Sequence, residues 1–223
     1  MLCQHPSVSA QGTTVGVLEE FVVTAQMHEE SAQEVPIAIS VFDTDTLTAM
    51  GVTDIAGMTG HVPNLLVQPT VGGSVNAAIS IRGSGLTSNN LSRDTAVGLY
   101  LNGVPISKTS GAIFDGIDIE RMEILRGPQG TLYGRNTVAG AINIITAKPS
   151  GEFSGYLTLG AGNADLRTLR SSIDLPAIGK VGVAAGQSST KIAYISRVRD
   201  WFFSNDAEGL KDFDNRDQWG GRA

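Results

Sequence analysis

The spacing of apolar and polar residues changes twice along the chain. Residues 1–34 mix Ser, Gln, Gly, Thr and Glu around one apolar island, 21–23, which is too small to form a core. From 35 to 149 short apolar runs are separated by turn residues, and beyond 149 apolar and polar residues alternate one by one. We therefore predict a flexible arm, then a compact domain, then a sheet whose two faces differ.

The compact domain is expected to contain several strands and two short helices. Asp43 can cap a helix over 44–50 that follows a strand at 37–42, and a second helix is expected over 53–60. Further strands are expected at the apolar runs 64–68, 77–82, 97–101 and 121–126, and Asn102 and Gly103 predict a hairpin turn. These elements do not follow a regular βαβ order, which favours an α+β domain with a small mixed sheet.

The end of the chain predicts antiparallel strands of a β-barrel. Alternation with a period of two covers 156–161, 169–175 and 191–199, and a fourth segment begins at 216. Such segments, separated by turns, are typical of barrels in the outer membrane. Because the smallest barrels need about eight strands, we expect an incomplete transmembrane β-barrel. The expected limits are 1–34 for the arm, 35–149 for the compact domain and 150–223 for the barrel strands.

Charge and composition exclude several functions. With 16 basic against 22 acidic side chains, the net charge of −6 argues against nucleic acid as a partner. Cys3 is the only cysteine and there are three histidines, so no structural zinc site is expected. The first ten residues lack the basic and apolar stretches of a signal peptide, and the sequence has no apolar run as long as the roughly 18 residues of a membrane-spanning helix.

Motifs for catalysis are weak or incomplete. Ser188 and Lys191 have the Ser-x-x-Lys spacing of penicillin-binding enzymes, but the two further motifs of those enzymes are missing. Residues 83–85 lack the third glycine of a dinucleotide-binding loop, and the acids within 212–217 lack the glycine and glutamate of a calcium loop. We therefore predict neither an active site nor a bound cofactor.

The segment 125–146 resembles the plug signature of TonB-dependent outer-membrane receptors. Segments at 35–40, 79–83, 100–104 and 119–124 also follow in the family's order, and 214–223 resembles an early barrel strand. The residues that form the signature are Gly127, Pro128, Gln129, Gly130, Tyr133, Gly134 and Arg135. The resemblance implies that 35–149 is a plug domain inside the lumen of a barrel of about 22 strands.

In this family the arm carries a TonB box, and the apolar island matches its position. The box would comprise Glu20, Phe21, Val22, Val23, Thr24 and Ala25. A β-branched stretch suits addition as a strand to the sheet edge of a partner. Phe21 stands where an aliphatic residue is usual, and Met27 and His28 replace a commonly basic pair, so the register on the partner stays open. The alternative is an apolar island in a tail.

Arg82 and Arg126 are the candidate contacts between the plug and the barrel. An arginine cannot lose its charge, so its burial inside a lumen requires carboxylate partners. The resemblance implies glutamates of the barrel wall as these partners. For Arg126 the alternative is pairing with Glu120 or Glu123 inside the plug.

The function implied by the resemblance is TonB-dependent active import of a scarce solute across the outer membrane of a Gram-negative bacterium. The arm would lie in the periplasm, and the plug would close the lumen. The expected partners are the periplasmic domain of TonB, outer-membrane lipid, the remaining barrel strands and an imported ligand of open class. A stand-alone periplasmic binding module without transport and a periplasmic enzyme remain alternatives. Ligand binding without a barrel would indicate the module, and substrate turnover the enzyme.

Overall fold

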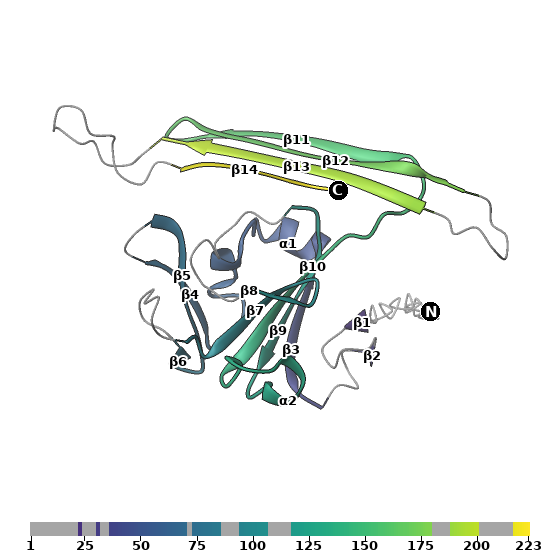
Figure 1. Ribbon diagram of the computed structural model, residues 1–223. Helices are drawn as coiled ribbons and strands as arrows, with labels where there is room; N and C mark the ends of the chain where they lie inside the picture. Colours follow the sequence, from purple (N-terminus) through teal and green to yellow (C-terminus); the bar gives the residue numbers. More distant parts are fainter. Residues whose placement is uncertain are drawn as a thin grey trace, which may run out of the picture.

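The fold is known from a computed structural model, which describes residues 22–23, 30–31, 36–70, 73–85, 94–106, 117–179, 188–200 and 216–223. Two bodies of β structure face each other (Figure 1). One is a compact domain that ends at Thr146, and the other is an open C-terminal sheet of four long strands that lies across one side of it.

The compact domain is built on a mixed sheet with the strand order β3-β9-β10-β7-β8. Its strands are β3 (Ala38–Asp43), β7 (Val97–Leu101), β8 (Val104–Ile106), β9 (Ile119–Arg126) and β10 (Gly140–Thr146). The central strand β10 runs parallel to β7 and antiparallel to β9, and all of its residues are buried. Burial on both faces explains its nearly continuous apolar sequence.

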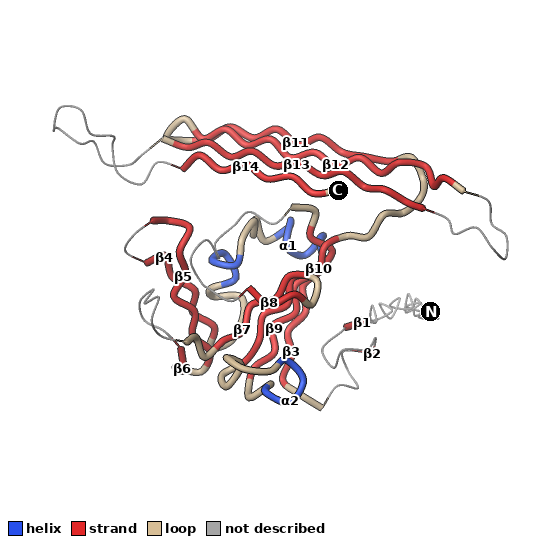
Figure 2. The backbone as a smooth tube through the Cα atoms, viewed as in Figure 1, coloured by secondary structure: helices blue, strands red, loops and turns tan. Residues whose placement is uncertain are grey.

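A smaller sheet and three short helices complete the compact domain. The sheet consists of β4 (Leu65–Thr70), β5 (Gly73–Ile81) and β6 (Ser84–Gly85), and the helices are α1 (Thr44–Ala49), the 3₁₀ helix η1 (Ile55–Met58) and α2 (Gly130–Tyr133). As predicted, the Asp43 side chain caps α1, accepting a hydrogen bond from the Thr46 N–H at 2.9 Å. The blue segments in Figure 2 show how little of the described part of the chain is helical.

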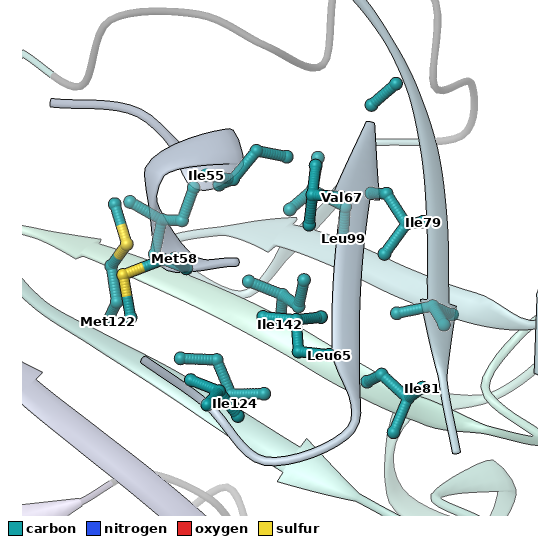
Figure 3. Close-up of a cluster of buried hydrophobic side chains, with 14 of the residues drawn as sticks. Ile55, Met58, Leu65, Val67, Ile79, Ile81, Leu99, Met122, Ile124 and Ile142 are labelled. Carbon is teal, nitrogen blue, oxygen red and sulfur yellow. The ribbon is translucent and has the colours of Figure 1, made fainter. Parts of the chain in front are cut away.

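The main core lies between the mixed sheet, the smaller sheet and η1 (Figure 3). The most deeply buried side chains there are Ile55, Met58, Ile79, Ile81, Met122, Ile124, Ile142 and Ile144. A second cluster contains Val23, Tyr100, Leu125, Tyr133 and Ala141. Ile124 and Leu125 are neighbours in β9 but belong to different clusters, because successive side chains of a strand point to opposite faces.

The C-terminal sheet is antiparallel and follows the order of the sequence. It contains β11 (Ser154–Gly162), β12 (Leu166–Ile178), β13 (Ser188–Arg199) and β14 (Arg216–Arg222). The strand register places one set of exposed apolar side chains on a single face: Leu157, Leu159, Ile173, Ile192, Tyr194, Val198 and Trp219. The opposite face carries Asp174 and Lys191, as the predicted alternation requires.

Some element limits differ from the predictions. The helix expected over 53–60 is only the single turn η1, since Gly57 and Gly60 are poor helix formers and Gly60 has a φ of +92°. The strand expected at 77–82 begins at Gly73, and Arg82 lies beyond its end with a φ of +54°. The Asn102-Gly103 hairpin is confirmed, with positive φ at both residues and Leu101 opposite Val104.

Two short strands belong to the segment predicted as an arm. β1 (Val22–Val23) pairs with β2 (Glu30–Ser31), so that Val23 lies opposite Glu30. Val23 is 1 % exposed because it packs into the second cluster. At these four residues the arm is therefore strand rather than flexible chain. The rest of 1–35 lies outside the described residues.

Candidate functional site

The signature residues form the turn that joins β9 to β10. The Gly127 N–H donates to the Ala139 carbonyl and the Gln129 N–H to the Thr137 carbonyl, each at 2.9 Å. Gly127 and Gly134 have φ values of +123° and +79°, which glycine adopts without strain. Gln129 and Tyr133 are buried, whereas Pro128, Gly130, Gly134 and Arg135 are exposed. The pattern Gly-Pro-Gln-Gly-x-x-Tyr-Gly thus specifies this connection and the position of Tyr133.

Tyr133 lies against Tyr100 beneath this turn. Their rings meet edge to face with centroids 4.9 Å apart, and the Tyr100 hydroxyl donates to the Tyr133 carbonyl at 2.6 Å. Burial, together with the charge of Glu123 and contact with Tyr100, raises the pKa of Tyr133 to about 12. Burial also raises the pKa of Tyr100. Both phenols are therefore neutral at physiological pH.

The predicted TonB box is described in part. Val23 packs with Tyr100, Leu125 and Tyr133, so the structure brings the apolar island against the signature turn. Glu20, Phe21, Thr24 and Ala25 lie outside the described residues. This contact between the island and the aromatic pair was not predicted, because nothing local to either segment in the sequence indicates the other.

A buried ion pair involves an arginine that the sequence analysis passed over. Glu123 is fully buried, and its carboxylate accepts from Arg121 Nε at 2.9 Å and from Asn143 Nδ2 at 3.4 Å. Arg121 also pairs with Glu120. Glu120 and Glu123, the alternative partners considered for Arg126, both contact Arg121. Arg121 and Glu123 lie two residues apart in β9 and therefore on the same face of the strand, which is the signal in the sequence that could have indicated their pairing.

Arg82 and Arg126 lie at the signature end of β9. Arg82 Nη1 is 3.7 Å from the position that a Cβ would take on Gly127, the residue after Arg126. Arg82 is exposed and Arg126 is half-buried. The Arg126 Nε is buried and has no hydrogen-bond partner among the described residues. The structure therefore brings the two predicted contact residues together at one edge of the compact domain.

The compact domain and the C-terminal sheet meet through charged and polar side chains. Lys191 on β13 lies 2.6 Å from Asp118, which precedes β9, and 3.5 Å from Asp174 on β12. Arg197 Nη1 donates to Thr53 Oγ1 at 3.3 Å. Ser188, three residues before Lys191, lies on the opposite face of β13, so the Ser-x-x-Lys spacing brings no serine to this lysine.

The described part of the chain contains neither a membrane-spanning helix nor a metal-binding cluster. None of the described helices is long and apolar enough to cross a membrane. No group of three or more His, Cys, Asp and Glu in this part of the chain is arranged to hold a metal ion.

An α+β domain that packs on the polar face of an antiparallel sheet with an apolar outer face is the arrangement of a plug against a barrel wall. The comparisons agree. Residues 31–141 match the family model described as "TonB-dependent Receptor Plug Domain". The chain carries the plug domain of a TonB-dependent outer-membrane receptor and belongs to that family. From here on the compact domain is called the plug and the C-terminal sheet the wall.

Two related proteins support membership of the same family. The chain is 30 % identical over 208 residues to the pesticin receptor of Yersinia pestis, covering 93 % of this chain and 29 % of the relative. It is 32 % identical to the vitamin B12 transporter BtuB of Photobacterium profundum, covering 85 % of this chain and 30 % of the relative. The chain therefore spans less than a third of the length of these relatives.

A solved structure has the same fold. The crystal structure of the ferric yersiniabactin uptake receptor FyuA from Yersinia pestis superposes with a TM-score of 0.65 at 28 % sequence identity. The match covers 80 % of this chain and 27 % of that one. Family members are receptors and transporters of the outer membrane, and the plug followed by wall strands is the part that this chain shares with them.

Proposed function

We propose that this chain is the gating part of a receptor that imports a scarce solute across the outer membrane with energy delivered through TonB. The observation that carries the proposal is the two-faced wall. Its outer face exposes Leu157, Leu159 and Trp219, while its inner face holds the plug through Lys191 and Arg197. An apolar outer face suits lipid, and a plug bound to the polar inner face closes a lumen.

The same face argues against a stand-alone periplasmic module. Seven large apolar side chains of the wall are between 39 % and 78 % exposed on one surface. In water such a patch would favour aggregation, whereas in an outer membrane it contacts lipid. The edge strands β11 and β14 would pair with further strands of the receptor.

For the arm, we propose that Glu20 to Ala25 form the TonB box. The support is local, since Val22 and Val23 already adopt strand geometry in β1 and TonB would take the same segment as an added strand. Val23 leaves its place against Tyr100 and Tyr133 when the box binds. Arg82 and Arg126, which lie at the signature end of β9, are proposed to meet glutamates on further wall strands of the receptor.

Calorimetry with the periplasmic domain of TonB tests the box. An added strand depends on main-chain hydrogen bonds, so Val22→Pro, which removes a donor, should weaken binding by roughly tenfold or more. Val22→Ala is the matched control and should bind nearly as well as the wild type. Equal affinity of the wild type and Val22→Pro would show that 20–25 is not the box. No binding of the wild-type chain at all would contradict the coupling to TonB.

The relatives bear names that refer to different cargoes, including pesticin, vitamin B12 and ferric yersiniabactin. What they share with this chain is the plug and the first wall strands. The proposal is accordingly built on the gating part, and the class of the imported solute is not assigned.

A further inference from the structure

The inner face of the wall carries a lysine held between two buried aspartates. The Lys191 side chain is 14 % exposed, and those of Asp118 and Asp174 are 9 % and 7 % exposed. Asp118 belongs to the plug, whereas Lys191 and Asp174 belong to neighbouring wall strands. The ammonium group of Lys191 therefore contacts both bodies of the molecule.

Further hydrogen bonds fix both aspartates in place. Asp118 has a φ of +53°, and its carbonyl accepts from the Ala147 N–H at 2.9 Å. Asp174 Oδ1 accepts from the Ser150 N–H at 3.2 Å. Asp118 immediately precedes β9, and Ala147 immediately follows β10. The lysine thus holds the open end of the β9–β10 pair and the linker that leads into the wall.

A cleft of about 350 Å³ lies next to this lysine, between α1 and the first wall hairpin. Its polar lining comes from Thr44, Thr48 and Asp118 of the plug and from Tyr156, Thr158 and Arg170 of the wall, and apolar side chains of the plug, among them Leu47, Val52 and Ile119, complete it. The Tyr156 hydroxyl is 3.5 Å from Asp118 Oδ1 at the boundary of the cleft. Asp118 therefore contributes to the cleft and to the lysine contact at once.

We propose that Lys191 is a latch that fastens the plug to the wall and closes this cleft at Asp118. Burying three charges is costly, and in some proteins buried charges are retained because they specify one arrangement over others. An apolar contact here would allow the plug to slide against the wall, whereas a lysine between two fixed carboxylates defines one position. The latch requires only the observed packing of plug and wall, and it does not depend on the import activity or on the TonB box.

The latch acts at the end of the plug that is remote from the arm in sequence. A pull on the arm reaches β3 first. The open end of β9 and β10 is held at Asp118, and the linker that follows β10 is held at Ser150 by Asp174. The β9–β10 pair should therefore stay on the wall until Lys191 releases Asp118.

Hydrogen exchange measured by mass spectrometry on the full 223-residue chain tests the latch. Lys191→Met should speed exchange of the Ala147 and Ser150 amides at least about tenfold, because both are held by the latch aspartates, and leave the β9 and β10 core amides unchanged. The matched control is Arg167→Met, which removes a cation from an exposed ion pair with Asp165 inside one hairpin. It should leave exchange at 147–150 unaltered.

Two further variants separate the latch from a general loss of fold. Lys191→Arg keeps the charge and should keep most of the protection. The charge swap Lys191→Glu with Asp118→Lys, made together with Asp174→Asn so that the new glutamate does not face a second carboxylate, should restore protection to within about threefold of the wild type. Unchanged exchange in Lys191→Met would overturn the latch. If Lys191→Met unfolds the chain, rescue by the swap supports the latch, and failure of the swap overturns it.

Discussion

Gly140 should not accept a side chain unless the neighbouring strand moves, and its alanine variant gives a sharp test of the packing. It is the first residue of β10 and has a φ of +157°. A Cβ added there would lie 2.2 Å from the Leu125 carbonyl oxygen and 2.9 Å from Ile81 Cδ1. The first of these atoms is backbone of the neighbouring strand β9, so it cannot turn away as a flexible side chain could.

The magnitude follows from the displacement that the methyl group requires. Ordinary contacts begin at 3.4 Å, so β9 and β10 would have to separate by roughly 1 Å at the point where they pair. Overpacking of a well-packed core costs about 1–3 kcal/mol, and loss of ladder hydrogen bonds at Gly140 and Arg126 adds to it. We expect Gly140→Ala to destabilise the plug by about 3 kcal/mol.

Gly130→Ala is the matched control, because Gly130 lies in α2 of the same signature and nothing is within 4 Å of its added Cβ. This variant should be neutral or stabilise by about 0.5–1 kcal/mol, since alanine favours helix. Urea unfolding followed by circular dichroism reports both changes. With a slope of about 2 kcal/mol/M, Gly140→Ala should lower the midpoint by about 1.5 M. Equal midpoints for the two variants would refute the close approach of β9 and β10.

Three further predictions concern the plug. Asp43→Ala should destabilise it by about 1 kcal/mol through loss of the α1 cap. Because the hydrogen bond from Thr46 lowers the pKa of Asp43 below its ordinary value of 3.8, the difference from the wild type in urea should be complete at neutral pH and vanish as the pH falls through the lowered pKa. Tyr133 should ionise only near pH 12, so its stabilising effect is complete below about pH 10 and lost as the pH rises towards 12; absorbance titration should lose this last step in Tyr133→Phe, and an unchanged titration would contradict its burial. Arg126→Met should be nearly neutral in this chain but cost about 3–5 kcal/mol in a receptor that supplies a buried wall glutamate, and equal destabilisation in both would place its partner within the plug.

Much of the fold could be predicted because its determinants are local. The alternation at 156–161 defines which residues of β11 face the plug, and Asp43 before a short apolar turn defines the start of α1. Gly127 and Gly134 could likewise be found in the sequence, since their positive φ values are properties of single residues.

The long-range contacts could not be predicted, because local sequence patterns do not indicate which faces of distant strands pack against each other. Asp118 and Lys191 are separated by the whole of β9 to β12, and neither position is unusual by itself. In the sequence Val23 belongs to an apolar island in a polar arm. In the structure only 1 % of its surface is exposed, because it packs with Tyr133. Arg121 was overlooked for a related reason, since only the structure shows that Glu123 beside it is fully buried.

The strand order of the plug also bears on how the protein comes to be folded. β3 is the first strand of the mixed sheet in sequence, yet its only neighbour in that sheet is β9, with Ala38 opposite Arg126. A chain that emerges from its N-terminus therefore cannot complete this edge until β9 has been made. Until then β3 is an unpaired apolar strand, and a chaperone that covers residues 38–43 would protect the newly made chain from aggregation at the stage when the sheet is still incomplete.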